Sequence, residues 1–135
     1  MSTRLLDANV VIALTVRTHE HHDAAQTWLR GVDQCLLCPV TEGALVRFAL
    51  RSWGSGPDAL QLLEAITAHP RVRWIGDDLS YREVDLAGLR GHRQATDAYL
   101  VALARRHGAV LATFDSALAA TWPEHTELIE GPAAP

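Results

Sequence analysis

The sequence predicts an α/β domain with a central, mostly parallel sheet of four to five strands flanked by helices. Short apolar runs alternate along the chain with longer segments in which apolar residues recur at helical spacing, and this alternation is typical of parallel β-α-β units. The chain has 135 residues, 48% of them hydrophobic and 21% charged, which suits one hydrophobic core and excludes a disordered chain. The expected strands are residues 4–6, 35–38, 72–75, 110–114 and 127–129.

Helical spacing and helix breakers place the connecting elements. Ala25, Trp28 and Leu29 form the apolar stripe of one helix. Residues 53–57 interrupt the helical pattern because their glycines and proline do not fit a helix interior, and Asp58 is expected to cap the helix that follows. The expected helices are residues 10–16, 23–30, 42–51, 58–68, 81–87 and 96–107, with a short one at 116–120.

One domain is expected over residues 1–130, followed by a flexible tail over residues 131–135, whose prolines prevent further strand pairing. The apolar runs are far shorter than the roughly 20 residues of a membrane span, and the N-terminus shows no signal-peptide pattern. These features predict a soluble, cytoplasmic protein. Cys35 and Cys38 lie in one apolar run without a second pair, so we expect buried thiols rather than a disulfide or a zinc site.

The charge balance constrains the possible mechanisms. Sixteen acidic and twelve basic residues give a formal net charge of -4, and every basic residue is arginine. This charge does not by itself indicate a nucleic-acid partner, but four carboxylates held on a metal ion would leave the remaining surface neutral. The absence of lysine excludes mechanisms that need a Schiff-base or phosphate-cradling lysine.

Two acids lie on helix faces that should be buried. The residues three, four and seven positions after Glu42 are all apolar, and the same holds for Asp97. Each carboxylate therefore shares a face with core residues. Asp23 lacks such neighbours and is expected to be an ordinary exposed acid.

Two further acids directly follow expected strands, namely Asp7 and Asp115. Parallel strands bring their carboxyl ends to one edge of a sheet, where helices begin, so these two acids are expected to converge with Glu42 and Asp97. Each acid alone could be a helix cap, but four ionised carboxylates in one crevice would repel each other without a cation. Magnesium or manganese is the expected occupant, because both prefer oxygen ligands. The pair at 77–78 also follows a strand, but we expect that strand at the edge of the sheet and the pair therefore in a solvated loop.

Four short motifs carry a resemblance to a known family. They are LLDANVV at residues 5–11, Thr41-Glu42 with Arg47 five residues on, QATDAYL at 94–100 and TFD at 113–115. In order and spacing they resemble PIN-domain ribonucleases, and more narrowly the VapC-type toxins of bacterial toxin–antitoxin pairs. The resemblance runs from residue 4 to residue 129. It implies a three-layer PIN-like domain and a metal-dependent endoribonuclease that hydrolyses RNA phosphodiester bonds.

The resemblance also implies roles for individual residues. Asp7 and Asp97 would be the principal metal ligands, Glu42 a ligand or a water-orienting base, and Asp115 an outer ligand acting partly through water. The expected supporting donors are Asn9 and Thr113. The candidate RNA-binding residues, which could equally belong to solvated segments, are Arg47, Arg90, His92 and Arg93.

The partners implied by the resemblance are an RNA substrate, a cognate antitoxin that blocks the acidic crevice, and a second copy of the chain. The apolar content of residues 42–68 makes that region the expected dimer contact. Two other functions remain open, namely a catalytically inactive PIN-like binding module and another acidic-crevice phosphohydrolase. An aspartyl phosphohydrolase usually has a second Asp two residues after the first, where this chain has Asn9.

Two other residue groups are expected to be structural. The histidines of segment 19–22 lack a partner cluster and are expected to form a polar loop rather than a metal site. Trp28 and Trp74 are expected in or near the core. Trp53 and Trp122 are expected to be loop anchors or interface residues.

Overall fold

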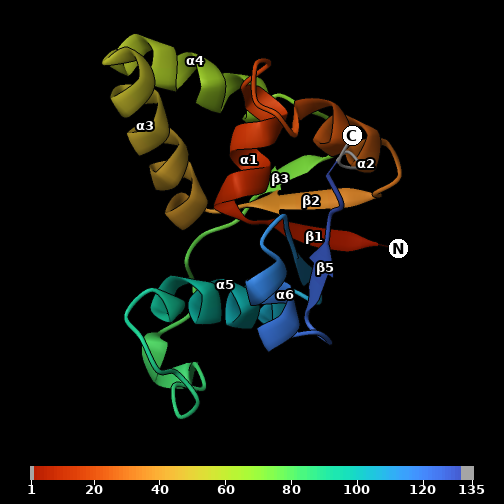
Figure 1. Cartoon of the computed structure of the whole chain (residues 1–135), viewed down its shortest axis with the longest axis vertical. Helices are drawn as coiled ribbons and strands as arrows, with labels where there is room; N and C mark the ends of the chain where they lie inside the picture. The colour runs from red at the N-terminus through yellow and green to blue at the C-terminus, as the bar shows by residue number, and fades with distance from the viewer. Residues whose placement is uncertain (1, 132–135) are drawn as a thin grey trace.

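Five parallel strands in the order β3-β2-β1-β4-β5 form the centre of the protein, seen here in a computed structural model that describes residues 2–131 (Figure 1). The central strand β1 pairs in register with both neighbours, so that Arg4 faces Cys35 on one side and Val110 on the other. The predicted parallel α/β sheet is therefore confirmed. The strands are β1 (Thr3–Leu6), β2 (Gln34–Leu37), β3 (Val72–Trp74), β4 (Val110–Thr113) and β5 (Thr126–Leu128).

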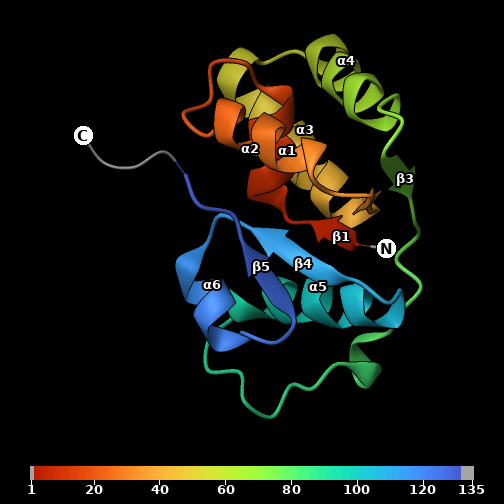
Figure 2. The same cartoon turned by 90° about the vertical axis from the view of Figure 1, so that its right-hand side faces the viewer.

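Helices cover the two faces of the sheet (Figure 2). Residues along a strand alternate between faces, so Leu5 packs into one core and Leu6 into the other. The core around Leu5 contains residues of α5 and α6, and the core around Leu6 contains residues of α1 to α4. The helices are α1 (Ala8–Thr15), α2 (His22–Arg30), α3 (Pro39–Trp53), α4 (Gly56–Thr67), α5 (Gln94–Arg106) and α6 (Ser116–Thr121).

The turn between α3 and α4 differs in detail from the prediction. Helix α3 runs to Trp53 and ends at Gly54, whose φ of 70° is in the left-handed region that glycine adopts without strain. Ser55, rather than Asp58, caps α4, because its hydroxyl accepts a hydrogen bond from the Asp58 amide at 3.3 Å. The break predicted at residues 53–57 is confirmed only at Gly54 and Ser55, because Gly56 and Pro57 already begin α4, and the predicted cap is wrong.

The helix expected at residues 81–87 is also wrong. Only a short 3-10 turn, η1 (Tyr81–Glu83), forms there, started by a capping box between Ser80 and Glu83. Val84 then becomes extended and its side chain is buried against the α5 core, while Leu86 is 47% exposed. The segment therefore has one apolar anchor rather than an apolar face, and it continues as a loop into α5.

Other expectations are resolved by burial. Cys35 and Cys38 are buried free thiols, and burial raises the pKa of Cys35 to about 12, which confirms a structural role. Of the tail predicted at 131–135, all but Gly131 lies outside the described residues. Within residues 2–131, no helix has both the length and the apolar character needed to cross a membrane.

Candidate functional site

Asp7 occupies the turn between the central strand and the first helix. Its amide donates a hydrogen bond to the Ala112 carbonyl of β4 at 3.0 Å, which extends the sheet by one residue. Its Oδ1 accepts a hydrogen bond from the Ala8 amide at 2.8 Å, so the carboxylate caps α1. The residue is only 7% exposed. A carboxylate is thus held in a buried position at the carboxyl edge of the sheet.

Thr113, at the end of β4, fixes the other oxygen of Asp7. Its hydroxyl donates to Asp7 Oδ2 at 2.7 Å and accepts hydrogen bonds from Asn9 Nδ2 at 3.3 Å and from the Asp115 amide at 3.0 Å. A hydroxyl has one proton and two lone pairs, so this arrangement uses its full capacity and commits the proton to Asp7. Asn9 Oδ1 in turn accepts a hydrogen bond from the Phe114 amide at 3.2 Å. The structure therefore places both predicted supporting donors beside Asp7.

Asp97 and Asp115 bring two more charges to Asp7. Asp97 lies in the first turn of α5, and its pKa is raised to about 6 because burial desolvates the carboxylate and because Asp7 and Asp115 are nearby anions. Burial also raises the pKa of Asp7, partly opposed by the hydrogen bonds from Thr113 and Ala8 and reinforced by Asp115. These three aspartates come from three separate segments and repel each other at one edge of the sheet.

Asp115 is a helix cap as well as a member of this group. Its Oδ1 accepts hydrogen bonds from the amides of Ala117 at 2.9 Å and Leu118 at 3.1 Å, which begins α6. The cap occupies one oxygen of an otherwise exposed side chain. Asp115 can therefore cap α6 with one carboxylate oxygen and still contribute its charge to the group of aspartates.

Glu42 lies in the first turn of α3 and has a different set of neighbours. Its Oε1 accepts a hydrogen bond from the indole Nε1 of Trp74 at 3.0 Å. Its charge raises the pKa of Asp77, whose carboxylate is perturbed first by partial burial. By contrast, the anions that raise the pKa of Asp97 are Asp7 and Asp115. Glu42 is thus not among the anions that raise the pKa of Asp97, and its charge acts on Asp77.

Sequence reasoning missed the surroundings of Glu42. Trp74, predicted near the core, is 54% exposed, whereas Asp77 lies exposed in a loop as predicted, with its pKa raised by partial burial and by the charge of Glu42. Their positions in the sequence could have indicated that they lie near the acids, since both residues lie at or just after the end of β3, at the same edge of the sheet as Asp7. The expected edge position of β3 is confirmed, and at an edge a large side chain such as Trp74 can remain exposed.

The donor set fits a hydrated divalent cation. Within residues 2–131, no three His, Cys, Asp or Glu side chains lie close enough together to enclose a metal ion. Magnesium, however, usually keeps several waters and is held by only one or two carboxylates. Buried, mutually repelling aspartates such as Asp7 and Asp97 suit that mode of binding, because a cation would offset the charge that raises the pKa of Asp97.

The candidate RNA-binding residues lie on helix α3 and in the loop that precedes α5. Arg47 is exposed on α3, and its Nη1 lies 3.3 Å from where a Cβ on Gly43 would be, so the guanidinium folds back beside the residue that follows Glu42. The remaining candidates are exposed in the loop that leads into α5 and Asp97, namely Arg90, His92 and Arg93.

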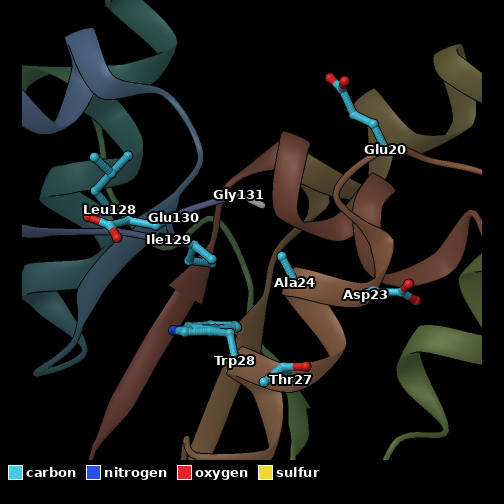
Figure 3. Close-up of a pocket in the computed structure, with 9 residues that line it drawn as sticks. All are labelled: Glu20, Asp23, Ala24, Thr27, Trp28, Leu128, Ile129, Glu130 and Gly131. Atoms are coloured by element: carbon cyan, nitrogen blue, oxygen red, sulfur yellow. The ribbon is translucent and has the colours of Figure 1, made fainter. Parts of the chain in front are cut away.

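A separate cavity of about 540 Å³ lies between α2 and the segment that follows β5 (Figure 3). Trp28 and Ile129 contribute its apolar surface, while Glu20, Asp23 and Glu130 add negative charge. Such a lining repels phosphate groups, so this cavity is not suited to RNA. The residues that line it do not include the three aspartates of the sheet edge.

The raised pKa of Asp97 has a measurable consequence for stability. Because its pKa of about 6 in the folded chain exceeds the ordinary value of 3.8, the folded state binds the proton more tightly, and stability falls as pH rises through this window. In a chelating buffer, Asp97→Asn should leave the melting temperature almost unchanged near pH 4 and raise it by about 2–5 °C above about pH 7. Calorimetry at several pH values measures this difference, and a pH-independent difference would contradict it.

Comparison with known proteins agrees with the fold and the order of these residues. The PIN domain family model matches residues 4–121. Ribonuclease VapC29 of Mycobacterium tuberculosis is 51% identical over 118 residues, which cover 87% of this chain and 89% of that protein. Both matches span most of the chain. The residues matched by the family model include Asp7, Glu42, Asp97 and Asp115.

Two solved structures share the fold. One is VapC20 of Mycobacterium tuberculosis, described as a Sarcin-Ricin loop cleaving toxin, with a TM-score of 0.69 at 16% identity, covering 97% of this chain and 100% of that chain. The other is a toxin–antitoxin complex from Klebsiella pneumoniae, with a TM-score of 0.67 at 18% identity, covering 96% of this chain and 99% of that chain. On the sequence match and the shared fold together, this chain belongs to the PIN domain family and is a relative of the VapC ribonucleases.

Proposed function

We propose that this protein is a metal-dependent endoribonuclease that hydrolyses RNA phosphodiester bonds and acts as a VapC-type toxin. The observation that carries the proposal is the convergence of Asp7, Asp97 and Asp115 at the sheet edge, where burial and then the charges of Asp7 and Asp115 raise the pKa of Asp97 to about 6. The 51% identity to a VapC ribonuclease supports the reaction class. Carboxylates that repel each other at a sheet edge are the ligands expected for an ion that assists phosphodiester hydrolysis.

In this proposal Asp7 and Asp97 hold a magnesium or manganese ion, and Asp115 acts through water. When bound, such an ion supplies an activated water and neutralises charge on the phosphate. The proton and the cation compete for Asp97, because a carboxylate with a pKa of about 6 is partly protonated close to neutral pH. Metal binding should therefore weaken as the pH falls below about 6.

The chain's own residues keep these groups oriented. The Thr113 hydroxyl holds Asp7 Oδ2, and the Ala8 amide holds Oδ1, so the carboxylate cannot rotate freely. Trp74 holds Oε1 of Glu42, which we assign as a further ligand or as the group that orients the attacking water. Arg47, Arg90, His92 and Arg93 would bind RNA phosphates around the site.

We also propose a cognate antitoxin as the partner that inhibits the enzyme. One protein of the same fold is described as part of a toxin–antitoxin complex. The acidic edge around Asp97 would attract a basic segment, and an arginine inserted there would occupy the place of the cation. Inhibitor and RNA substrate would meet this chain in the cytoplasm.

A homodimer is proposed through α3 and α4. Leu50, Trp53 and Leu60 on these helices are 44%, 49% and 56% exposed, so they offer apolar surface that a partner could bury. Residues 42–68 would bury this surface against a second copy. Light scattering measures the mass in solution, and the mass of a monomer would count against the dimer.

The experiment that tests the proposed function is cleavage of purified cellular RNA. We expect cleavage with magnesium or manganese, loss of cleavage in excess chelator and recovery when either ion is restored in excess of the chelator. Sequencing of the fragments identifies the cleaved site and checks for 5′-phosphate ends. A chain that stays inactive with every RNA and either ion, although it is folded and binds a partner protein, would instead be the inactive binding module.

A further inference from the structure

Trp74 is a large aromatic residue left on the surface beside the candidate active site. It is the last residue of the edge strand β3, and its side chain is 54% exposed. Strand β3 lies two strands from β1, which places it roughly 10 Å from the strand that leads into Asp7. An exposed indole at this position lies within reach of nucleotides next to a phosphate bound at the aspartates.

The indole is held in place although it is not buried. Its Nε1 donates a hydrogen bond to Glu42 Oε1 at 3.0 Å, and its Cη2 lies 4.0 Å from where a Cβ on Gly76 would be. The ring is thus fixed from α3 on one side and flanked by the backbone of the following loop on the other. A fixed ring loses little conformational entropy when a ligand covers it.

Arg47 supplies a cation on the same helix as Glu42. The Arg47 guanidinium folds back over Gly43, the residue next to Glu42, and Glu42 is the residue that holds the indole. Glu42 and the Arg47 guanidinium of α3, together with the Trp74 indole of β3 that is hydrogen-bonded to Glu42, thus bring a carboxylate, a guanidinium and an aromatic face to the N-terminal part of α3. Aromatic side chains that stack with bases, combined with arginines that contact phosphates, are the usual means of binding single-stranded RNA.

We propose that Trp74 stacks against a base of the RNA substrate close to the cleaved bond and that Arg47 binds a neighbouring phosphate. This inference rests on the proposed ribonuclease function and identifies single-stranded RNA as the form that the site binds. The hydrogen bond to Glu42 couples the stacked base to a residue of the acidic edge. Trp74 is therefore assigned a role in positioning the substrate.

Binding is measured without cleavage, in the Asp97→Asn background, by fluorescence anisotropy with a short, labelled single-stranded RNA of mixed sequence. We expect Trp74→Leu to raise the Kd by about 5- to 150-fold, which is the effect of losing one stacked base. Trp74→Phe keeps an aromatic face and should stay within about threefold of the parent. The matched control is Leu128→Ala, which removes a 40% exposed apolar side chain from β5, the opposite edge strand of the sheet, and should leave the Kd unchanged.

Kinetics of the chain with Asp97 intact distinguish stacking from support of Glu42. Stacking predicts that Trp74→Leu raises KM more than Trp74→Phe does, whereas both substitutions remove the hydrogen bond to Glu42. Equal Kd values for Trp74→Leu and the parent would overturn the inference, as would equal losses of kcat in both variants without any change in Kd. A parent chain that cleaves no RNA would refute the proposed function. The comparison of Kd values would still test the stacking, because anisotropy measures binding without cleavage.

Discussion

Asp97→Asn is expected to abolish RNA cleavage while leaving the fold intact. The substitution removes the charge of one proposed metal ligand and preserves nearly the same volume in the first turn of α5. Cleavage should fall by at least about 100-fold, because even residues that only support a metal ligand contribute 10- to 100-fold. Rates measured on a defined RNA in excess magnesium test this, and circular dichroism checks the fold.

The matched control for this variant is Asp23→Asn. Asp23 is an exposed acid on α2, so its substitution makes the same change in net charge away from the sheet edge. We expect it to cleave RNA at the rate of the parent chain. Normal cleavage by Asp97→Asn, or an equal loss in both variants, would show that Asp97 has no specific role. In a chelating buffer near neutral pH, Asp97→Asn should also stabilise the fold, because it removes a repelled charge.

Thr113→Val is expected to reduce both stability and activity. Valine has nearly the shape of threonine but no hydroxyl, so Asp7 Oδ2 loses its donor, and Asn9 Nδ2 and the Asp115 amide lose their acceptor. Leaving buried polar groups without partners costs about 1–3 kcal/mol in the free energy of unfolding. Cleavage should fall by about 10- to 100-fold, because the proposed ligand Asp7 is no longer held.

Thr113→Ser provides the control, because it keeps the hydroxyl and loses only a methyl group. It should retain most of the cleavage activity, although the lost methyl leaves a small cavity that reduces stability. Denaturant unfolding and cleavage rates of both variants measure the two effects separately. If the Val and Ser variants cleaved RNA equally well, the hydroxyl would have no part in orienting Asp7.

The fold and part of the site could be predicted from the sequence because they depend on local patterns. Short apolar runs separated by helical segments predict parallel strands, and parallel strands place residues such as Asp7 and Asp115 at one edge. The apolar neighbours of Asp97 along its helix predicted a partly buried carboxylate, in agreement with its raised pKa. These inferences need only the spacing of apolar residues along each helix or strand and the parallel direction of the strands.

The environment of Glu42 could not be predicted in the same way. Its apolar neighbours indicated a position near the other acids, but its hydrogen-bond partner comes from β3, which lies 32 residues further along the chain. The edge position of β3 was expected, but whether Trp74 at its end is covered depends on how the helices pack around the sheet, and its side chain is 54% exposed. The same limit applies to residues 81–87, where burial of Val84 rather than helix propensity decides the backbone path.

By itself, the sequence determined the parallel α/β architecture, the positions of the acids relative to strand ends and the family to which the chain belongs. The tertiary structure alone decided which acids interact: Asp97 with Asp7 and Asp115, and Glu42 with Asp77 beside an exposed Trp74. The physical reason is that residue spacing fixes the face of an element on which a side chain lies. The distances between charges, however, depend on strand order and on how the helices pack across the sheet.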